Sequence, residues 1–235
     1  MKEFDINDIR EFYENVDTVW PKSNKWHDIN QKEIKQFIHK FSFQKCRILN
    51  AGSGGNNYGL NEDMCHVDIA ENKVNNTKNY VICNIENMPF ANDSFDAVIC
   101  VGSVLNYSDA VKAIGEMSRV LQKNGFIILE FECSYSFEFM GTDAFKANAA
   151  IITTYYFNTL HKMWVYSLDY ITRILRENNL IIKKTYPYHI LSTYIYYRNK
   201  SESTAAQYAC FDRFFRHLPI IRRYSGNVIL YAQKT

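Results

Sequence analysis

Residues 50–56, Asn50-Ala51-Gly52-Ser53-Gly54-Gly55-Asn56, overlap the end of the apolar run Arg47–Ala51. Three glycines in four positions let the backbone turn tightly and approach a ligand closely, because no side chain intervenes. The start of a helix after such a turn offers unpaired N–H groups. The segment therefore predicts a nucleotide or nucleoside site at the end of a strand, although an ordinary tight turn has the same composition.

Six further apolar runs have strand character and alternate with helical patterns. Runs that are apolar on both faces are typical of parallel strands buried on both sides. The alternation predicts an α/β protein with a Rossmann-like sheet of seven strands and helices on both faces. The six runs are Cys65–Ile69, Tyr80–Cys83, Ser94–Val101, Phe126–Phe131, Leu180–Tyr186 and Asn227–Gln233.

Three helices are expected from their capping signals. Asp28 followed by Gln31 predicts a helix that extends to about Phe41. Ser108 or Asp109 would cap a second helix that ends near Leu121, and Ser167 a third that stops at Asn178. Two aromatic-rich regions, Cys133–Trp164 and Tyr188–Leu218, show no regular period and are interpreted as insertions.

Asp68 lies at the tip of the second predicted strand. In dinucleotide-binding proteins an acidic residue at this place, about 20 positions after the glycine turn, accepts hydrogen bonds from ribose hydroxyls. A helix cap or a surface acid is the alternative interpretation. Asp68 after the glycine turn strengthens the prediction of a nucleoside site.

Residues 84–99, NIENMPFANDSFDAVI, make the prediction specific. The segment resembles the third-to-fourth-strand region of class I S-adenosylmethionine-dependent methyltransferases of type 11. In that family an acid precedes Leu-Pro-Phe, a short polar turn and Phe-Asp; here Met88-Pro89-Phe90 and Phe95-Asp96 stand in those places. With the glycine turn and Asp68, the resemblance covers about residues 46–132. It also disfavours an NAD-dependent enzyme, which the glycine turn alone would allow.

The resemblance implies S-adenosyl-L-methionine as the cofactor and a role for each matching position. Gly52, Ser53 and Gly54 would line the methionine and ribose moieties, and Asp68 would bind the ribose diol. Asn84 and Ile85 would contact the adenine edge, and Val101 and Gly102 would border the sulfonium. This sequence departs from the family at Asn50 and Asn84, where acids are usual, and at Asn56, where a glycine is usual. Asparagine keeps an acceptor oxygen, so we expect altered cofactor binding, with a catalytically inactive homologue as the alternative.

The chain is expected to form one domain over residues 1–235. Residues 1–44 would form an N-terminal helical lid, residues 45–133 the cofactor-binding core, and residues 134–235 the acceptor-side insertions and last two strands. Tyr13 and Trp26 in the lid would shield the sulfonium, because aromatic faces attract cations; plain helix packing is the alternative. His27 is interpreted as structural.

Methyl transfer needs positioning and exclusion of water more than a protein nucleophile, and no metal is expected. A hydroxyl acceptor would need a base, for which His161 and His189 are candidates, whereas an amine would need only its neutral form. Tyr107 follows the fourth predicted strand, where it would orient the acceptor. Each of the three would otherwise be a structural residue.

The composition limits the remaining possibilities. The six cysteines are scattered singly, which favours reduced thiols, and without an apolar span or signal peptide the protein is expected to be cytoplasmic. Residues 171–235 carry eleven Lys or Arg against three Asp or Glu, although the whole chain has a net charge of +2. That excess indicates a solvated face or a surface for an acidic partner.

The favoured function is methylation of a small molecule, such as a sugar or glycan intermediate, at oxygen or nitrogen. A nucleic-acid (tRNA) methyltransferase and a non-catalytic S-adenosylmethionine-binding partner protein are the alternatives. The sequence has no Asn/Asp-Pro-Pro-Tyr/Phe motif, which makes nucleic acid the weaker choice. The oligomeric state stays open.

Overall fold

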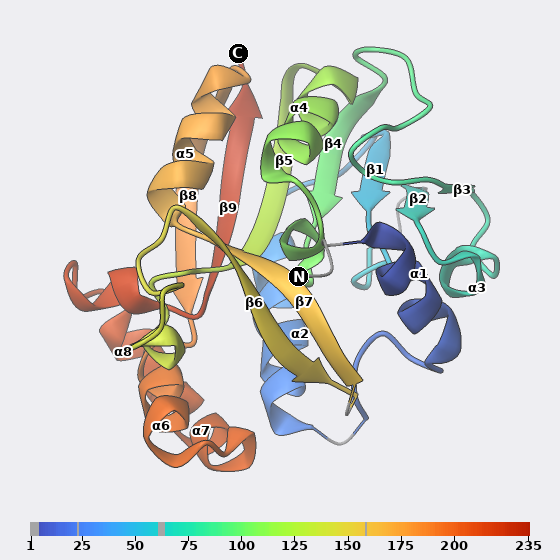
Figure 1. Ribbon diagram of the computed structural model, residues 1–235. Helices are drawn as coiled ribbons and strands as arrows, with labels where there is room; N and C mark the ends of the chain where they lie inside the picture. Colours follow the sequence, from blue (N-terminus) through green and yellow to red (C-terminus); the bar gives the residue numbers. More distant parts are fainter. Residues whose placement is uncertain (1–4, 23, 61–63, 158) are drawn as a thin grey trace.

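Seven apolar strands form the central sheet of the computed structural model, which describes residues 5–22, 24–60, 64–157 and 159–235 (Figure 1). The strand order is β3-β2-β1-β4-β5-β9-β8, and only β9 runs antiparallel to its neighbours. The predicted fold class is therefore confirmed. The strands are β1 (Ile48–Ala51), β2 (Met64–Asp68), β3 (Tyr80–Ile82), β4 (Phe95–Cys100), β5 (Leu121–Glu132), β8 (Leu180–Tyr188) and β9 (Asn227–Lys234).

Alternate residues of the sheet pack against helices on opposite faces. Ile48 and Ile99 face helix α2 (Lys25–Ile38), whose apolar stripe includes Ile34, Phe37 and Ile38. The intervening residues, such as Leu49 and Val98, face helices α4 (Ala110–Val120) and α5 (Leu168–Glu177). Both faces are thus removed from water, which is the condition for parallel strands that are apolar throughout.

Capping residues explain where the main helices begin. Asp109 accepts the backbone N–H of Val111, and Ser167 accepts that of Tyr170, as expected from the sequence. The expected start at Asp28 is wrong: α2 begins at Lys25, because Asn24 Oδ1 accepts the backbone N–H of Trp26 at 2.9 Å. Asparagine is as good an N-cap as aspartate. The sequence therefore contains two possible N-caps for this helix, Asn24 and Asp28, and the helix begins at the first.

The first expected irregular insertion contains regular structure. Strands β6 (Ala149–Tyr156) and β7 (Thr159–Tyr166) form an antiparallel hairpin outside the main sheet. The hairpin lacks the usual alternation of apolar and polar residues because its solvent face is also apolar: Ile151 is 45% exposed and Tyr155 is 73% exposed. Thr154 and Tyr156, at the alternate positions, are half-buried.

Short helices account for the rest of the described chain. The N-terminal segment contains α1 (Ile6–Asn15), and residues 1–4 and 23 of the expected lid lie outside the described ranges. The second aromatic-rich region is helical, which the sequence did not indicate. The short elements are α3 (Glu71–Val74), η1 (Val104–Tyr107), η2 (Phe137–Phe139), α6 (Leu191–Asn199), α7 (Glu202–Tyr208), η3 (Ala209–Phe211), α8 (Asp212–Phe215) and η4 (Ile221–Tyr224).

The described residues contain no helix long and apolar enough to cross a membrane. They also contain no disulfide and no group of three or more His, Cys, Asp or Glu that would hold a metal ion.

Candidate cofactor and acceptor site

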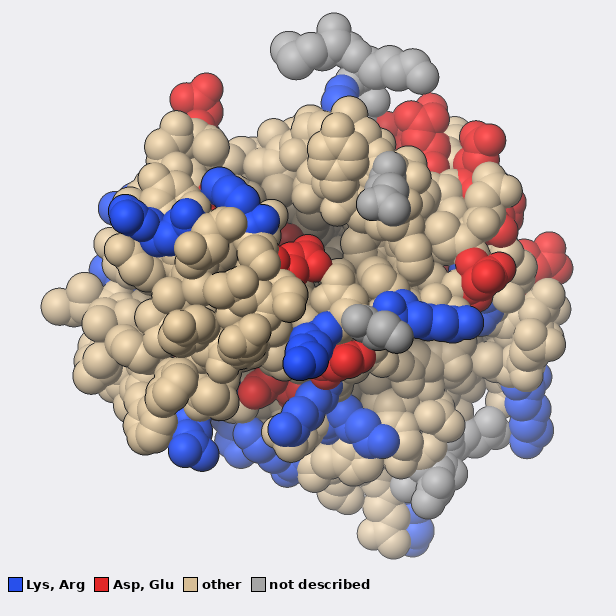
Figure 2. Space-filling model, turned by 90° about the horizontal axis from the view of Figure 1, so that it is seen from below, with Lys and Arg blue, Asp and Glu red and all other residues tan. Residues whose placement is uncertain are grey.

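A cavity of about 500 Å3 lies at the carboxyl end of the parallel strands. Segments that follow β1 to β5 form its floor, and α1, α2 and the β6–β7 hairpin enclose it. Figure 2 shows a hollow in this face, with acidic surface beside it. Its volume is within the range of roughly 300 to 1,000 Å3 that is typical of small-molecule sites.

The glycine turn after β1 shapes one end of the cavity. Gly52 has a φ of +69°, and a Cβ there would lie 2.2 Å from Cγ1 of Val104. A Cβ on Gly54, whose φ is +52°, would lie 2.8 Å from Cγ1 of Val19. These two positions need glycine because neighbouring segments already approach the backbone closely. The turn is therefore packed between the N-terminal segment and η1.

Asp68 joins the glycine turn to the tip of β2. Its Oδ2 accepts the backbone N–H of Gly54 at 2.8 Å, and its Oδ1 accepts that of Ala70 at 3.0 Å. Burial raises the pKa of Asp68, while these hydrogen bonds act in the opposite direction. Each carboxylate oxygen has a second lone pair, so Asp68 can hold the turn and still accept a hydrogen bond from a ligand in the cavity that it lines.

The segments after β3 and β4 form the neighbouring walls. Asn84 and Ile85 line the cavity, and Asn84 Oδ1 accepts the backbone N–H of Glu86 at 2.9 Å. Val101 and Gly102 line it after β4. Gly102 has a φ of +83°, and a Cβ there would lie 3.2 Å from the Trp20 ring. A flat indole thus covers the backbone where β4 ends.

A buried carboxylate fixes the turn after β4. Glu130 accepts the backbone N–H groups of Gly102 and Ser103 at 2.9 and 2.7 Å. It also accepts hydrogen bonds from the Tyr188 hydroxyl and Asn227 Nδ2, at 3.0 and 2.7 Å. Burial raises the pKa of Glu130, and the four donors oppose that shift. Glu130 is therefore saturated with donors and serves to position the turn.

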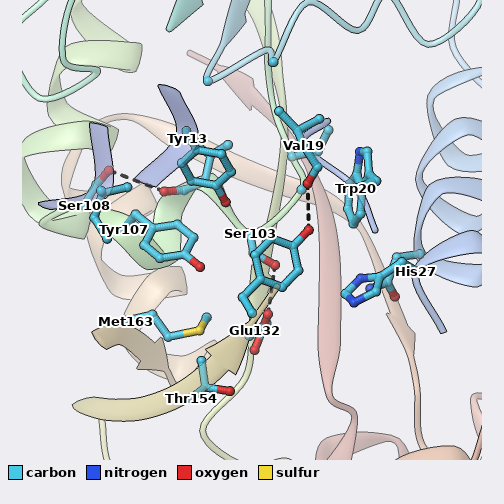
Figure 3. A pocket seen from close by; sticks show the side chains of 18 of the residues that line it. Tyr13, Val19, Trp20, His27, Ser103, Tyr107, Ser108, Glu132, Thr154 and Met163 are labelled. Carbon is cyan, nitrogen blue, oxygen red and sulfur yellow. Dashed lines mark hydrogen bonds between the residues drawn. The ribbon is translucent and has the colours of Figure 1, made fainter. Parts of the chain in front are cut away.

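Glu132, at the end of β5, faces the cavity itself (Figure 3). Ser103 Oγ donates a hydrogen bond to its Oε1 at 3.0 Å. Burial, and then the nearby carboxylates of Glu138 and Glu130, raise the pKa of Glu132 to about 8. Such a group changes its protonation near neutral pH, which is what proton transfer requires.

Tyrosines enclose the side of the cavity next to Glu132. Figure 3 shows Tyr13 and Tyr107 on one side of Glu132 and His27 and Trp20 on the other. The Tyr13 and Tyr107 rings pack edge to face with centroids 6.1 Å apart, and burial raises the pKa of both hydroxyls. These phenols stay protonated, so they remain hydrogen-bond donors.

The hairpin is tied to the N-terminal segment across the cavity. The Tyr156 hydroxyl donates a hydrogen bond to the backbone oxygen of Val19 at 2.7 Å. Both residues line the cavity. This hydrogen bond thus connects the hairpin to the N-terminal segment beside the site.

The three histidines near the site differ in their access to it. His27 lines the cavity, and its buried Nδ1 has no hydrogen-bond partner among the described residues. Burial lowers its pKa. His27 was interpreted as structural, yet its free ring nitrogen is available to a ligand.

His189 and His161 do not line the cavity within the described part of the chain. The ring nitrogens of His189 lie 3.0 Å from Ser192 Oγ and 2.6 Å from Asn30 Oδ1, and the ring stacks on Trp26 at 3.8 Å. Burial lowers the pKa of His189 to about 3, so it is neutral. The His161 ring packs against Phe12 at 4.4 Å. Neither ring lines the cavity in the described part of the chain, and their roles as bases stay predictions.

The structure brings the ten predicted cofactor residues and Tyr107 together around one cavity. Their roles in binding stay predictions. Sequence reasoning missed Glu132, Glu138 and Tyr156, which also line the cavity. Glu132 had a detectable signal, because it is an acid at the end of a buried strand. The other two lie in the insertion whose structure the sequence did not indicate.

Comparison with known proteins gives a family match for the core. Residues 46–129 match the family model described as a methyltransferase domain. An uncharacterised protein of Methanocaldococcus jannaschii is 31% identical over 152 residues, which are 60% of this chain and 58% of that protein. The aligned part of this chain therefore spans just over half the length of that relative.

Solved structures show the same fold. Geranyl diphosphate C-methyltransferase from Streptomyces coelicolor has a TM-score of 0.62 and 13% identity, with 97% of each chain covered. The 1,6-didemethyltoxoflavin-N1-methyltransferase of Burkholderia thailandensis has a TM-score of 0.60 and 10% identity, with 97% of this chain and 86% of that chain covered. At these identities the likeness concerns the fold alone.

Proposed function

We propose that this chain transfers a methyl group from S-adenosyl-L-methionine to a small molecule. Its residues 46–129 match the family model described as a methyltransferase domain. The observation that carries the proposal is the convergence of the glycine turn, Asp68 and Asn84 on one enclosed cavity. Two of the structural neighbours are methyltransferases of small molecules, which supports the same function.

The residues present fit this cofactor. Gly52, Ser53 and Gly54 line the cavity, and Asp68 retains lone pairs for a ribose diol. Asn84 and Ile85 line the cavity and would contact the edge of the adenine ring. Tyr13, Trp20 and Trp26 also line it and provide aromatic faces that attract a sulfonium. Bound S-adenosylmethionine would supply an electrophilic methyl group. The role of the chain is then to align the acceptor and exclude water.

A small acceptor suits the enclosure of the site. The hydrogen bond from Tyr156 to Val19 joins the hairpin to the N-terminal segment across the cavity. A sugar hydroxyl would find donors and acceptors in Thr154, Tyr107 and Glu132, which line the acceptor side. Glu132, with its pKa near 8, would take the proton from a hydroxyl or an amine.

Nucleic acid is the weaker candidate on this geometry. None of the eleven basic residues of 171–235 is among the residues found to line the cavity in the described part of the chain. Arg216 lies over the Tyr186 ring and pairs with Glu33 at 3.4 Å, so part of this charge is engaged within the protein. A phosphate backbone would need free cations near the mouth of the site.

Calorimetry with S-adenosylmethionine and S-adenosylhomocysteine tests the cofactor, and we expect micromolar dissociation constants for both without added metal. NADH is the control ligand. A release assay with methyl-labelled donor against small-molecule acceptors, tRNA and DNA then tests the acceptor class. Binding of NADH in place of the two sulfur compounds would refute the proposal, and cofactor binding without turnover of any acceptor would favour a non-catalytic binding partner.

A further inference from the structure

The acceptor side of the cavity is acidic. Glu132, Glu138 and Glu202 line it, while Asp68 lines the cofactor side. The residues that line the cavity within the described ranges include no lysine and no arginine. A chamber whose described lining has carboxylates but no lysine or arginine disfavours an anionic guest and favours a cationic one.

The carboxylates are held in different ways. Ser136 Oγ donates to Glu138 Oε1 at 2.8 Å, and Asn24 Nδ2 donates to Glu202 Oε2 at 2.7 Å. Ser103 Oγ is the side-chain donor to Glu132 among the described residues. Glu132 and Glu138 are both half-buried, and burial raises the pKa of both. Buried carboxylates with few donors leave acceptor capacity for a ligand.

A second observation in the same cavity supports a ligand that donates hydrogen bonds. Nδ1 of His27 is buried without a partner in the described part of the chain. Because burial lowers the pKa of His27, its ring is neutral and has one acceptor nitrogen. The aromatic rings of Trp26, Tyr156 and Tyr196 line the cavity as well and provide faces that attract cations.

We propose that the methyl acceptor is a small amine, cationic in solution, whose nitrogen binds at the carboxylates of Glu132 and Glu138. This inference rests on the proposed function and narrows its substrate class to amines, including amino sugars. Glu132 is then a catalytic residue. The same chamber disfavours free phosphorylated acceptors, whose charge would face the three glutamates.

The chemical step balances with the groups present. The ammonium form of the acceptor gives one proton to the carboxylate of Glu132, which leaves a neutral nitrogen with its lone pair. That nitrogen forms the new N–C bond as the S–CH3 bond of the donor breaks, and the electron pair of the broken bond stays on sulfur. The methylated nitrogen keeps the positive charge and leaves as an ammonium ion. Glu132 is then protonated, as it is before the amine binds, so the one proton released on amine binding is the net proton of the reaction.

Several groups face Glu132 and would shape its titration. Glu138 and Glu130 raise its pKa, whereas the hydrogen bond from Ser103 lowers it. Lys200 lowers the pKa of Glu138, and Glu202 raises it. A bound ammonium would stabilise the ionised form of Glu132, so amine binding near pH 7 should release a proton. The remaining neighbours are Tyr13, Tyr107, Tyr156 and His27, all of which are neutral at that pH.

Matched ligands test the inference on protein saturated with S-adenosylhomocysteine. D-glucosamine, D-glucose and D-glucuronate form one set, and tryptamine, tryptophol and indole-3-propionate form another. We expect the amine to bind at least tenfold more tightly than the alcohol in at least one set, and the carboxylate most weakly. Calorimetry in two buffers of different ionisation enthalpy should show proton release for the amine alone.

Glu132→Gln removes the charge at nearly constant shape, and Glu177→Gln at the exposed end of α5 is the control. We expect Glu132→Gln to weaken amine binding at least tenfold and to abolish proton release, while S-adenosylhomocysteine binds as before. An equal loss of S-adenosylhomocysteine affinity would place Glu132 at the cofactor and overturn the inference. No preference for amines in either set, including no binding, would overturn it too. Failure of the parent protein to bind S-adenosylhomocysteine would instead refute the proposed function.

Discussion

Asp68 and Gly54 are joined by a hydrogen bond of 2.8 Å from the glycine backbone N–H to the carboxylate. The residue expected to bind a ribose diol therefore also holds the glycine turn that is expected to contact the cofactor. Its substitution has two effects on binding, because it removes a ligand contact and releases the turn. The sequence alone had suggested only the first.

For Asp68→Asn we expect the affinity for S-adenosylhomocysteine to fall by roughly tenfold or more, because hydrogen bonds to a charged acceptor contribute about 1.5 to 3 kcal/mol. Asp68→Ala should lose more, since it also leaves the Gly54 and Ala70 N–H groups without their acceptor. Calorimetry gives the affinities. Hydrogen exchange at Gly54 separates the two effects, and unchanged affinity in a folded Asp68→Ala would contradict this account.

Gly52→Ala should reduce both stability and cofactor binding. The added Cβ would lie 2.2 Å from Val104, at a backbone φ of +69° that L residues rarely adopt. We expect a loss in the free energy of unfolding of about 1 to 3 kcal/mol. Gly141→Ala is a matched control, because Gly141 also has a positive φ but a Cβ there meets nothing within 4 Å. Urea denaturation measures the free energy of unfolding of both variants. Equal losses of stability in Gly52→Ala and Gly141→Ala would show that backbone strain alone is responsible.

Tyr156→Phe removes the hydroxyl that donates to the Val19 oxygen and keeps the ring. We expect faster hydrogen exchange in the N-terminal segment and a several-fold lower kcat/KM, with the free energy of unfolding changed by about 1 kcal/mol or less. Tyr155→Phe is the control, since Tyr155 is 73% exposed. Equal exchange rates in the two variants would show that the hydrogen bond does not close the site.

Glu132 should make stability decrease with rising pH. Its folded pKa of about 8 lies above the ordinary value of about 4.3, so the unfolded chain loses its proton first. The contribution of Glu132 to the free energy of unfolding is complete below about pH 4.3 and is lost as the pH rises toward 8. Relative to the parent, Glu132→Gln should therefore gain on the order of 1 to 3 kcal/mol between pH 5 and pH 8.5. Urea denaturation at both pH values checks this, and a constant difference would argue against the raised pKa.

His189 should have the opposite pH dependence. Burial lowers its pKa to about 3 from the ordinary value of about 6.5, so its contribution is complete above pH 6.5 and is lost as pH falls toward 3. At pH 7.5 His189→Gln should be less stable than the parent, because the contacts to Asn30 and Ser192 change. The stability gap should narrow by pH 4.5. A gap that stays constant would mean that His189 does not become protonated on unfolding.

The sequence predicted the sheet well, and the residues expected to bind the cofactor meet at one cavity, because both depend on local signals. Seven apolar runs correspond to the seven strands of the main sheet, and the ends of the first four carry the predicted cofactor residues other than Tyr13 and Trp26. The acceptor side depends on contacts between distant segments, such as Tyr156 with Val19, 137 positions apart. Sequence patterns do not report such pairs. The contact of a His189 ring nitrogen with Asn30 Oδ1, 159 positions away, is another such pair.

Strand β9 lies between β5 and β8, although it comes last of the strands along the chain. Its Asn227 also donates to Glu130, which holds the Gly102–Ser103 turn. During synthesis on the ribosome, the central sheet cannot close until residues 227–234 have left the exit tunnel. Until then β8 has no partner strand. A stalled or truncated nascent chain would therefore expose an unpaired sheet edge, which would make it a target for chaperones and proteases.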